Sequence, residues 1–150
     1  ILDDSSPEAV CYDRQRPPSF DKIWRQIVTD WPRLEGRVSY RTEDLRCAEI
    51  TAADLVVSVH ACGGLSDIVL GLAQQARARL ALLPCCHDLD TCDTAGLDGW
   101  MDGPLAVDAV RMLRLKNAGY AVSARKIPQE ITPKNRLLLA HPLIVSVEGG

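Results

Sequence analysis

Two apolar runs separated by one predicted helix constrain the fold of this chain more than any other feature. The runs are Leu55–Val59 and Leu80–Leu83, and residues 65–78 between them have the periodicity of a helix. A strand, a helix and a second strand of these lengths form a βαβ unit, in which the strands are parallel and the crossover is right-handed. Ligands of open α/β sheets bind beyond the carboxyl ends of the strands. We therefore expect any functional site near residues 60–63 and 84–88.

Further predicted elements lie on both sides of this unit. Short apolar runs predict strands at 9–12 and 37–41, and periodic apolar side chains predict helices at 19–31 and 105–118. Strands at 120–127 and 136–141 are close enough in the chain to form an antiparallel hairpin. Such alternation is typical of an α/β fold with a doubly wound, mostly parallel sheet and helices on both faces. We interpret residues 1–150 as a single domain.

Charge and composition argue against several classes of function. The net charge is −3 and no basic stripe is present, so the chain shows no strong nucleic-acid signal. No apolar run approaches the roughly 20 residues of a membrane span, so we expect no membrane partner. Six cysteines, two of them adjacent, are too few for a disulfide scaffold. We expect free thiols and a cytoplasmic location.

Motifs at the predicted strand ends resemble those of class I S-adenosylmethionine-dependent methyltransferases. The motifs are Cys11-Tyr12-Asp13, Glu43-Asp44-Leu45, His60-Ala61-Cys62-Gly63 and Pro84-Cys85-Cys86-His87. The last two resemble one subfamily in particular, and the match spans residues 9–141. The resemblance implies a Rossmann-like fold, S-adenosylmethionine as cofactor and methyl transfer to an unidentified acceptor.

The same resemblance implies roles for individual residues. Asp13 would bind the ribose hydroxyls of the cofactor and Asp44 its adenine amine, with Leu45 beside the ring. His60 and Cys62 would be the catalytic residues, and His60 could remove a proton from the acceptor. The implied cofactor-binding residues are Asp13, Asp44, Leu45, His60, Ala61 and Gly63.

The chain departs from the family pattern before Asp13. The family's first strand and glycine-rich loop should begin roughly twenty residues before this acid, but only twelve residues precede it. The domain would then be incomplete at its N-terminus, with unpaired strand edges that favour a homo-oligomer. Three explanations stay open: a longer protein, a domain that no longer binds cofactor, and a replacement strand such as residues 143–150.

Two alternative functions come from other classes. One is a non-catalytic methyltransferase-like binding or scaffold domain, which the missing glycine-rich loop favours. The other is a zinc-binding domain, because thiolate and imidazole are the usual zinc ligands. Adjacent cysteines on a strand point to opposite faces, so this alternative needs a turn, which Pro84 could supply. Its candidate metal ligands are Cys62, Cys85, Cys86 and His87.

Overall fold

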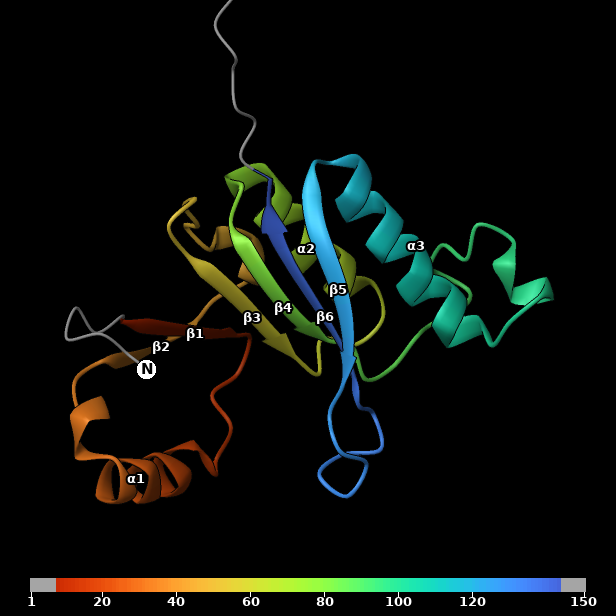
Figure 1. Ribbon diagram of the computed structural model, residues 1–150. Helices are drawn as coiled ribbons and strands as arrows, with labels where there is room; N and C mark the ends of the chain where they lie inside the picture. The colour runs from red at the N-terminus through yellow and green to blue at the C-terminus, as the bar shows by residue number, and fades with distance from the viewer. Residues whose placement is uncertain (1–7, 144–150) are drawn as a thin grey trace, which may run out of the picture. The chain divides into compact units, whose positions relative to one another are not determined.

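The computed structural model describes residues 8–143 (Figure 1). The chain divides into two compact units, the first ending at Glu49 and the second beginning at Ile50. The interpretation of residues 1–150 as one domain stays a prediction. The predicted replacement strand lies outside the described residues from Ile144 onward.

The order of elements agrees with the order predicted from the sequence, and most boundaries shift by one or two residues. Three helices and six strands are joined by short 3₁₀ turns (η) in the described chain. In order, they are β1 (Ala9–Asp13), α1 (Phe20–Asp30), η1 (Pro32–Leu34), β2 (Val38–Thr42), η2 (Leu45–Cys47), β3 (Leu55–Val59), α2 (Gly64–Ala76), β4 (Arg79–Leu83), η3 (Leu97–Gly99), α3 (Gly103–Asn117), β5 (Tyr120–Lys126) and β6 (Arg136–Pro142).

The first unit contains a two-stranded sheet and one helix. Strands β1 and β2 are parallel, with Asp13 paired to Thr42 at their carboxyl ends. Helix α1 ends at Asp30, shortly before Pro32, which lacks the backbone N–H that a continuing helix would need. The ring of Phe20 on α1 meets the ring of Tyr40 on β2 edge to face at 4.9 Å. This aromatic contact joins the helix to the sheet.

The second unit contains a four-stranded sheet in the order β3-β4-β6-β5. Strands β3 and β4 are parallel, as the βαβ prediction requires. Strand β6 is antiparallel to both β4 and β5, which confirms the predicted C-terminal hairpin. Helices α2 and α3 pack against each other and against the sheet, and both lie on the same side of it (Figure 1).

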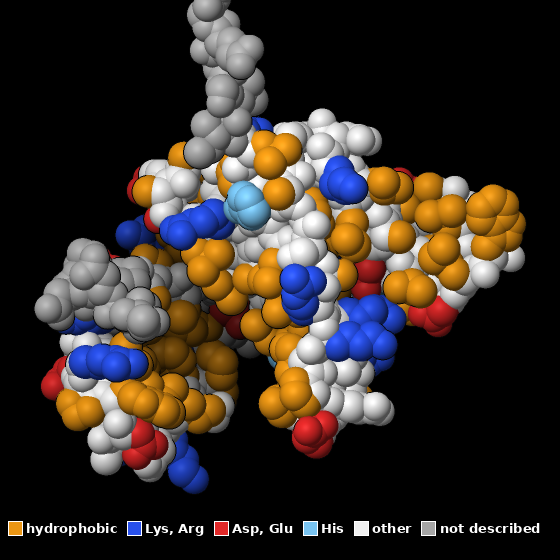
Figure 2. All heavy atoms as spheres, viewed as in Figure 1, with side chains coloured by type: hydrophobic (Ala, Val, Ile, Leu, Met, Phe, Trp, Pro, Cys, Tyr) orange, Lys and Arg blue, Asp and Glu red, His pale blue; other side chains and the backbone are white. Residues whose placement is uncertain are grey.

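The prediction of a doubly wound, mostly parallel sheet is therefore wrong. Strand β6 lies between β4 and β5, so two of the three strand pairs in this sheet are antiparallel. The two helices of the unit cover one face only. On the other face Leu55, Val57 and Val59 are 53%, 61% and 55% exposed, and Figure 2 shows apolar side chains gathered over this region. The structure is a small α/β fold with a mixed four-stranded sheet.

The core of the second unit lies between the sheet and its two helices. Leu80 and Leu82 of β4 are almost completely buried, as are Val107 and Leu115 of α3. Each such side chain stabilises the fold by about 1.5–3 kcal/mol relative to an exposed one. The Tyr120 hydroxyl is also buried and donates a hydrogen bond of 2.9 Å to a backbone carbonyl of α2. This core fixes α2 against β3 and β4, and α3 against β5.

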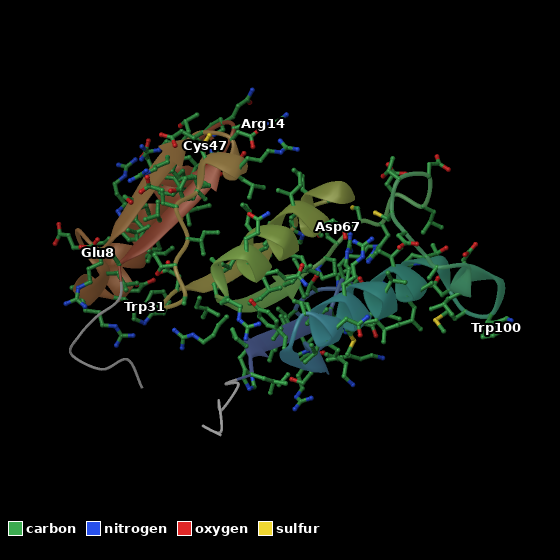
Figure 3. The ribbon with its side chains drawn as sticks, turned by 90° about the horizontal axis from the view of Figure 1, so that it is seen from above. Glu8, Arg14, Trp31, Cys47, Asp67 and Trp100 are labelled. Carbon is green, nitrogen blue, oxygen red and sulfur yellow. The ribbon has the colours of Figure 1, made fainter. Side chains whose placement is uncertain are left out.

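A long connection follows β4 and contains η3. Its Trp100 is 88% exposed and lies at the tip of the connection, away from the sheet (Figure 3). Within residues 8–143, no helix has both the length and the apolar character needed to cross a membrane.

Candidate thiol site

The carboxyl ends of β3 and β4 bring two short loops together. Val59 and Leu83, the last residues of the two strands, are paired in the parallel ladder. Beyond them, the His60 N–H donates to the Leu83 carbonyl at 3.3 Å, and the Gly63 N–H donates to the Cys86 carbonyl at 3.0 Å. These two hydrogen bonds hold residues 60–63 beside residues 83–86, which is where the sequence predicted a site.

Three cysteine thiols meet at this point. The Sγ atoms of Cys62 and Cys85 are 3.2 Å apart, and the Sγ atoms of Cys62, Cys85 and Cys86 all lie within 4.8 Å of one another. Cys85 is buried, whereas Cys62 and Cys86 are exposed. We call this group the thiol cluster. It combines one sheltered sulfur with two that solvent reaches.

The turn needed to bring adjacent cysteines to one point is present. Strand β4 ends at Leu83, so Pro84, Cys85 and Cys86 follow the strand and are not part of it. The alternation of side chains that would separate two neighbouring strand residues therefore no longer applies. On the other loop, His60 and Gly63 have positive φ angles of 62° and 54°. The chain turns sharply there, before α2 begins at Gly64.

The neighbouring thiols change the acidity of Cys62. The hydrogen bond with Cys85 raises the pKa of the Cys62 thiol to about 12, with smaller contributions from Cys86, burial and charge repulsion. At neutral pH, the free cluster therefore keeps the proton of Cys62. Any cation that binds Cys62 as a thiolate must displace this proton.

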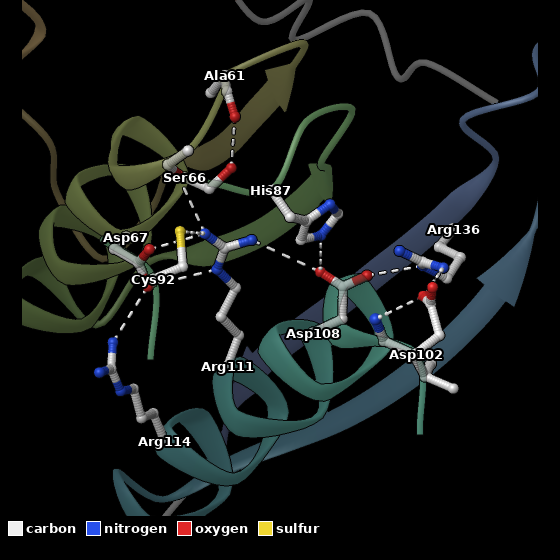
Figure 4. A network of polar contacts seen from close by, with 12 residues as sticks. Ala61, Ser66, Asp67, His87, Cys92, Asp102, Asp108, Arg111, Arg114 and Arg136 are labelled. Carbon is white, nitrogen blue, oxygen red and sulfur yellow. Dashed lines mark hydrogen bonds and ion pairs between the residues drawn. The ribbon is translucent and has the colours of Figure 1, made fainter. Parts of the chain in front are cut away.

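His87 does not join the thiol cluster. Its Nε2 atom lies 2.7 Å from Asp108 Oδ1, and its side chain is only 3% exposed (Figure 4). The other oxygen of Asp108 accepts a hydrogen bond of 2.7 Å from Arg136 Nε. Because this imidazole is paired with a carboxylate of α3, the metal-ligand set predicted from the sequence is reduced to the three cysteines.

Arg111 of α3 connects the elements around the site, and its role was not predicted from the sequence. It is 1% exposed, and its Nη2 atom donates to Asp67 Oδ2 at 2.7 Å and to the Gly63 carbonyl at 3.1 Å. The same nitrogen lies 3.7 Å from Cys92 Sγ. Burial alone would lower the pKa of Arg111, but the hydrogen bond and charge of Asp67 raise it by more. The net shift of the pKa is upward, so the guanidinium stays charged.

A sequence signal for this role exists. Arg111 lies four residues after Val107 and four residues before Leu115, so it is on the apolar face of the predicted helix. A charged residue at such a position needs a buried partner.

The predicted catalytic and cofactor-binding residues are distributed over both units. Of those in the second unit, Ala61 accepts a hydrogen bond of 2.6 Å from Ser66 Oγ through its carbonyl oxygen, and Gly63 is buried. His60 is exposed, and its backbone bonds to β4. The structure brings Cys62 together with Cys85 and Cys86. Catalytic roles for His60 and Cys62 stay predictions.

The remaining cofactor-binding candidates belong to the first unit. The Asp44 side chain caps η2 by accepting from the Arg46 N–H at 2.9 Å, and this hydrogen bond lowers the pKa of the carboxyl. Asp13 Oδ1 accepts from the Gln15 N–H at 3.4 Å, and Leu45 begins η2. These contacts give both acids a local structural role, and their binding of a cofactor stays a prediction.

Comparison with known proteins gives limited similarity. No family model matches the chain, and no solved structure matches it. A curated protein from Drosophila melanogaster, a glutathione S-transferase C-terminal domain-containing protein homolog, is 27% identical. The match covers 56% of this chain and 21% of that protein, so the chain corresponds to about a fifth of its relative.

These findings correct the methyltransferase resemblance. The name of the relative points to a glutathione S-transferase-like domain, no methyltransferase family model matches, and the sheet lacks the doubly wound form that the resemblance implied. Short motifs at strand ends recur in unrelated α/β proteins, which explains the error. Binding of S-adenosylmethionine, a homo-oligomeric state and the cytoplasmic location stay predictions.

Proposed function

We propose that this protein binds a zinc ion through the thiolates of Cys62, Cys85 and Cys86. The observation that carries the proposal is the convergence of three sulfur atoms within 4.8 Å of one another. Sulfur ligands of a tetrahedral zinc ion lie about 2.3 Å from the metal, hence about 3.8 Å from each other. The closest pair is 3.2 Å apart and no pair is more than 4.8 Å apart, so side-chain rotations of about an ångström would bring the three sulfurs to the separation that zinc requires.

The surroundings suit a cation with three thiolate ligands. Three thiolates and one zinc ion carry a net charge of −1, and a helix N-terminus favours negative charge. Helix α2 begins at Gly64, two residues after Cys62. Arg111 holds the Gly63 carbonyl and Asp67 of α2, so the helix start is fixed beside the cluster. The protein supplies both the ligands and a compensating local field.

The ligand count defines the kind of zinc site. Structural zinc sites usually have four protein ligands, whereas sites with three keep one position for water or substrate. The His87 imidazole is paired with the Asp108 carboxylate and cannot supply a fourth ligand without breaking that pair. Since Cys62 and Cys86 are exposed, the fourth position faces solvent. A polarised water or a small-molecule thiol would occupy it.

Metal analysis of protein purified with zinc tests this proposal. We expect about one ion per chain in the wild type and in Cys47→Ser, which changes an exposed cysteine outside the cluster. We expect far less than one in Cys62→Ser and Cys86→Ser. Replacement of zinc by cobalt adds a spectroscopic test, because thiolate ligation produces an intense charge-transfer band. Equal zinc content in all four proteins would contradict the proposal.

A second candidate function rests on the relative from Drosophila melanogaster, whose name includes a glutathione S-transferase C-terminal domain. Under this candidate function, the chain is a module of a glutathione S-transferase-like protein and binds glutathione. Titration calorimetry of reduced glutathione into the Cys62→Ser/Cys86→Ser double variant tests it without interference from metal. Measurable heat supports this candidate function, and no heat at millimolar glutathione contradicts it.

A further inference from the structure

The closest pair in the thiol cluster has a geometry that the zinc proposal does not require. Cys62 Sγ and Cys85 Sγ are 3.2 Å apart and come from loops that follow adjacent parallel strands. A disulfide bond is about 2.05 Å long, so a shift of about 1.2 Å would bring the sulfurs to covalent distance. The loop that carries Cys62 lies outside β3 and α2, so its side chain can rotate without breaking a helix or a ladder.

The two sulfurs differ in access to solvent. Cys62 is exposed, whereas Cys85 is 6% exposed. A soluble oxidant of the size of a tripeptide disulfide therefore reaches Cys62 and not Cys85. Cys85 lies where a resolving thiol must lie, directly beside the sulfur that the oxidant modifies.

We propose that Cys62 and Cys85 form a reversible disulfide, with glutathione disulfide as the oxidant. Cys62 first loses its proton to solvent, which its raised pKa makes the slow step. The resulting thiolate attacks one sulfur of glutathione disulfide, which breaks that bond and releases one glutathione thiolate. The Cys85 thiolate then attacks Cys62 Sγ, and the second glutathione leaves as a thiolate. The two protons lost by the cysteines end on the two glutathione molecules. Two protein thiols are oxidised and one glutathione disulfide is reduced.

This reaction goes beyond the proposed zinc site, because it takes place in metal-free protein. It also predicts how the two states of the cluster are related. Oxidation removes two of the three candidate ligands and leaves Cys86 as a single thiol. The disulfide and the bound metal ion therefore exclude each other.

Mass spectrometry of the metal-free, 150-residue chain tests the disulfide. The reduced protein is equilibrated in glutathione buffers of increasing oxidant fraction, its remaining thiols are alkylated, and its intact mass is measured. We expect a species with two fewer alkylated cysteines in the wild type and in Cys86→Ser. Fragmentation of the Cys86→Ser protein should give a cross-link between Cys62 and Cys85. The Cys62→Ser protein should lose the species, and reductant should restore full alkylation.

Two results would overturn the inference: a wild type that keeps all six cysteines alkylated in the most oxidising buffer, or a cross-link in Cys86→Ser that joins Cys62 to another cysteine. Far-UV circular dichroism of each variant shows that it is folded. Zinc content is measured separately on reduced protein, so failure of the disulfide and failure of the zinc site are distinguishable.

Discussion

Replacing Arg111 with methionine should destabilise the second unit by about 3 kcal/mol. Truncating one partner of a buried ion pair costs about 3–5 kcal/mol, because the other charge loses its partner. Arg111 is 1% exposed and donates to Asp67 and to the Gly63 carbonyl. Asp67 keeps the ion pair with Arg114 at 3.1 Å and is 27% exposed, so the cost falls at the lower end of this range. Methionine fills the apolar volume of the arginine stem.

Urea denaturation followed by far-UV circular dichroism measures this loss. The matched control is Arg114→Met, which removes the other arginine bound to Asp67. Arg114 is 44% exposed, and such surface pairs contribute about 1 kcal/mol or less. Adding Asp67→Asn to Arg111→Met should recover part of the loss, because the carboxylate is then neutral. A free energy of unfolding for Arg111→Met within 1 kcal/mol of the wild type would refute the role that we assign to this residue.

Three further predictions concern single contacts in the second unit. Tyr120→Phe removes the buried hydroxyl that donates to the Ala73 carbonyl of α2, which keeps its backbone donor from Ala78, and should lower the free energy of unfolding by about 1 kcal/mol in thermal denaturation. The backbone and side chain of Thr51 both donate to Asp54 and lower the pKa of that carboxyl. The stabilising effect of the Asp54 carboxylate is therefore present above its unfolded pKa of about 3.9. It is lost as the pH falls through the lower pKa that this carboxyl has in the folded protein. Asp54→Asn should flatten the dependence of melting temperature on pH only in that acid range. Gly119 ends α3 with a φ of 77°, a conformation that alanine adopts only with strain. Gly119→Ala should therefore lower the free energy of unfolding by about 1 kcal/mol in urea denaturation, whereas replacing a glycine inside an α-helix with alanine should not lower it.

The local elements could be predicted from the sequence because each has a local cause. The apolar, valine-rich run Leu55–Val59 predicted the bounds of β3, and Gly119 ended α3 in the left-handed conformation that glycine adopts most easily. Strand order could not be predicted in this way, because it depends on pairing between distant residues. One signal was available: residues 137–140 are apolar without alternation, which is typical of a central strand. Strand β6 is central in the observed sheet.

The candidate site could be predicted only in part, for a similar reason. The parallel strands β3 and β4 placed Cys62 near Cys85 and Cys86, and this followed from the βαβ pattern. The exclusion of His87 did not follow, because its partner Asp108 lies 21 residues further along the chain on α3. Which polar residue of a helix reaches a given loop depends on how the helix packs. A local pattern carries no such information.

The central position of β6 has a consequence for the order in which the protein can fold during synthesis. Strand β6 hydrogen-bonds to both β4 and β5, and in the described chain β5 has no other strand partner. A ribosome releases β3, α2 and β4, the βαβ unit, before β5 and β6. The second edge of β4 and the whole of β5 must then wait for residues 136–142, the last strand of the described chain. During this interval the nascent chain carries an open, apolar strand edge. Premature termination before β6 would therefore leave an aggregation-prone fragment.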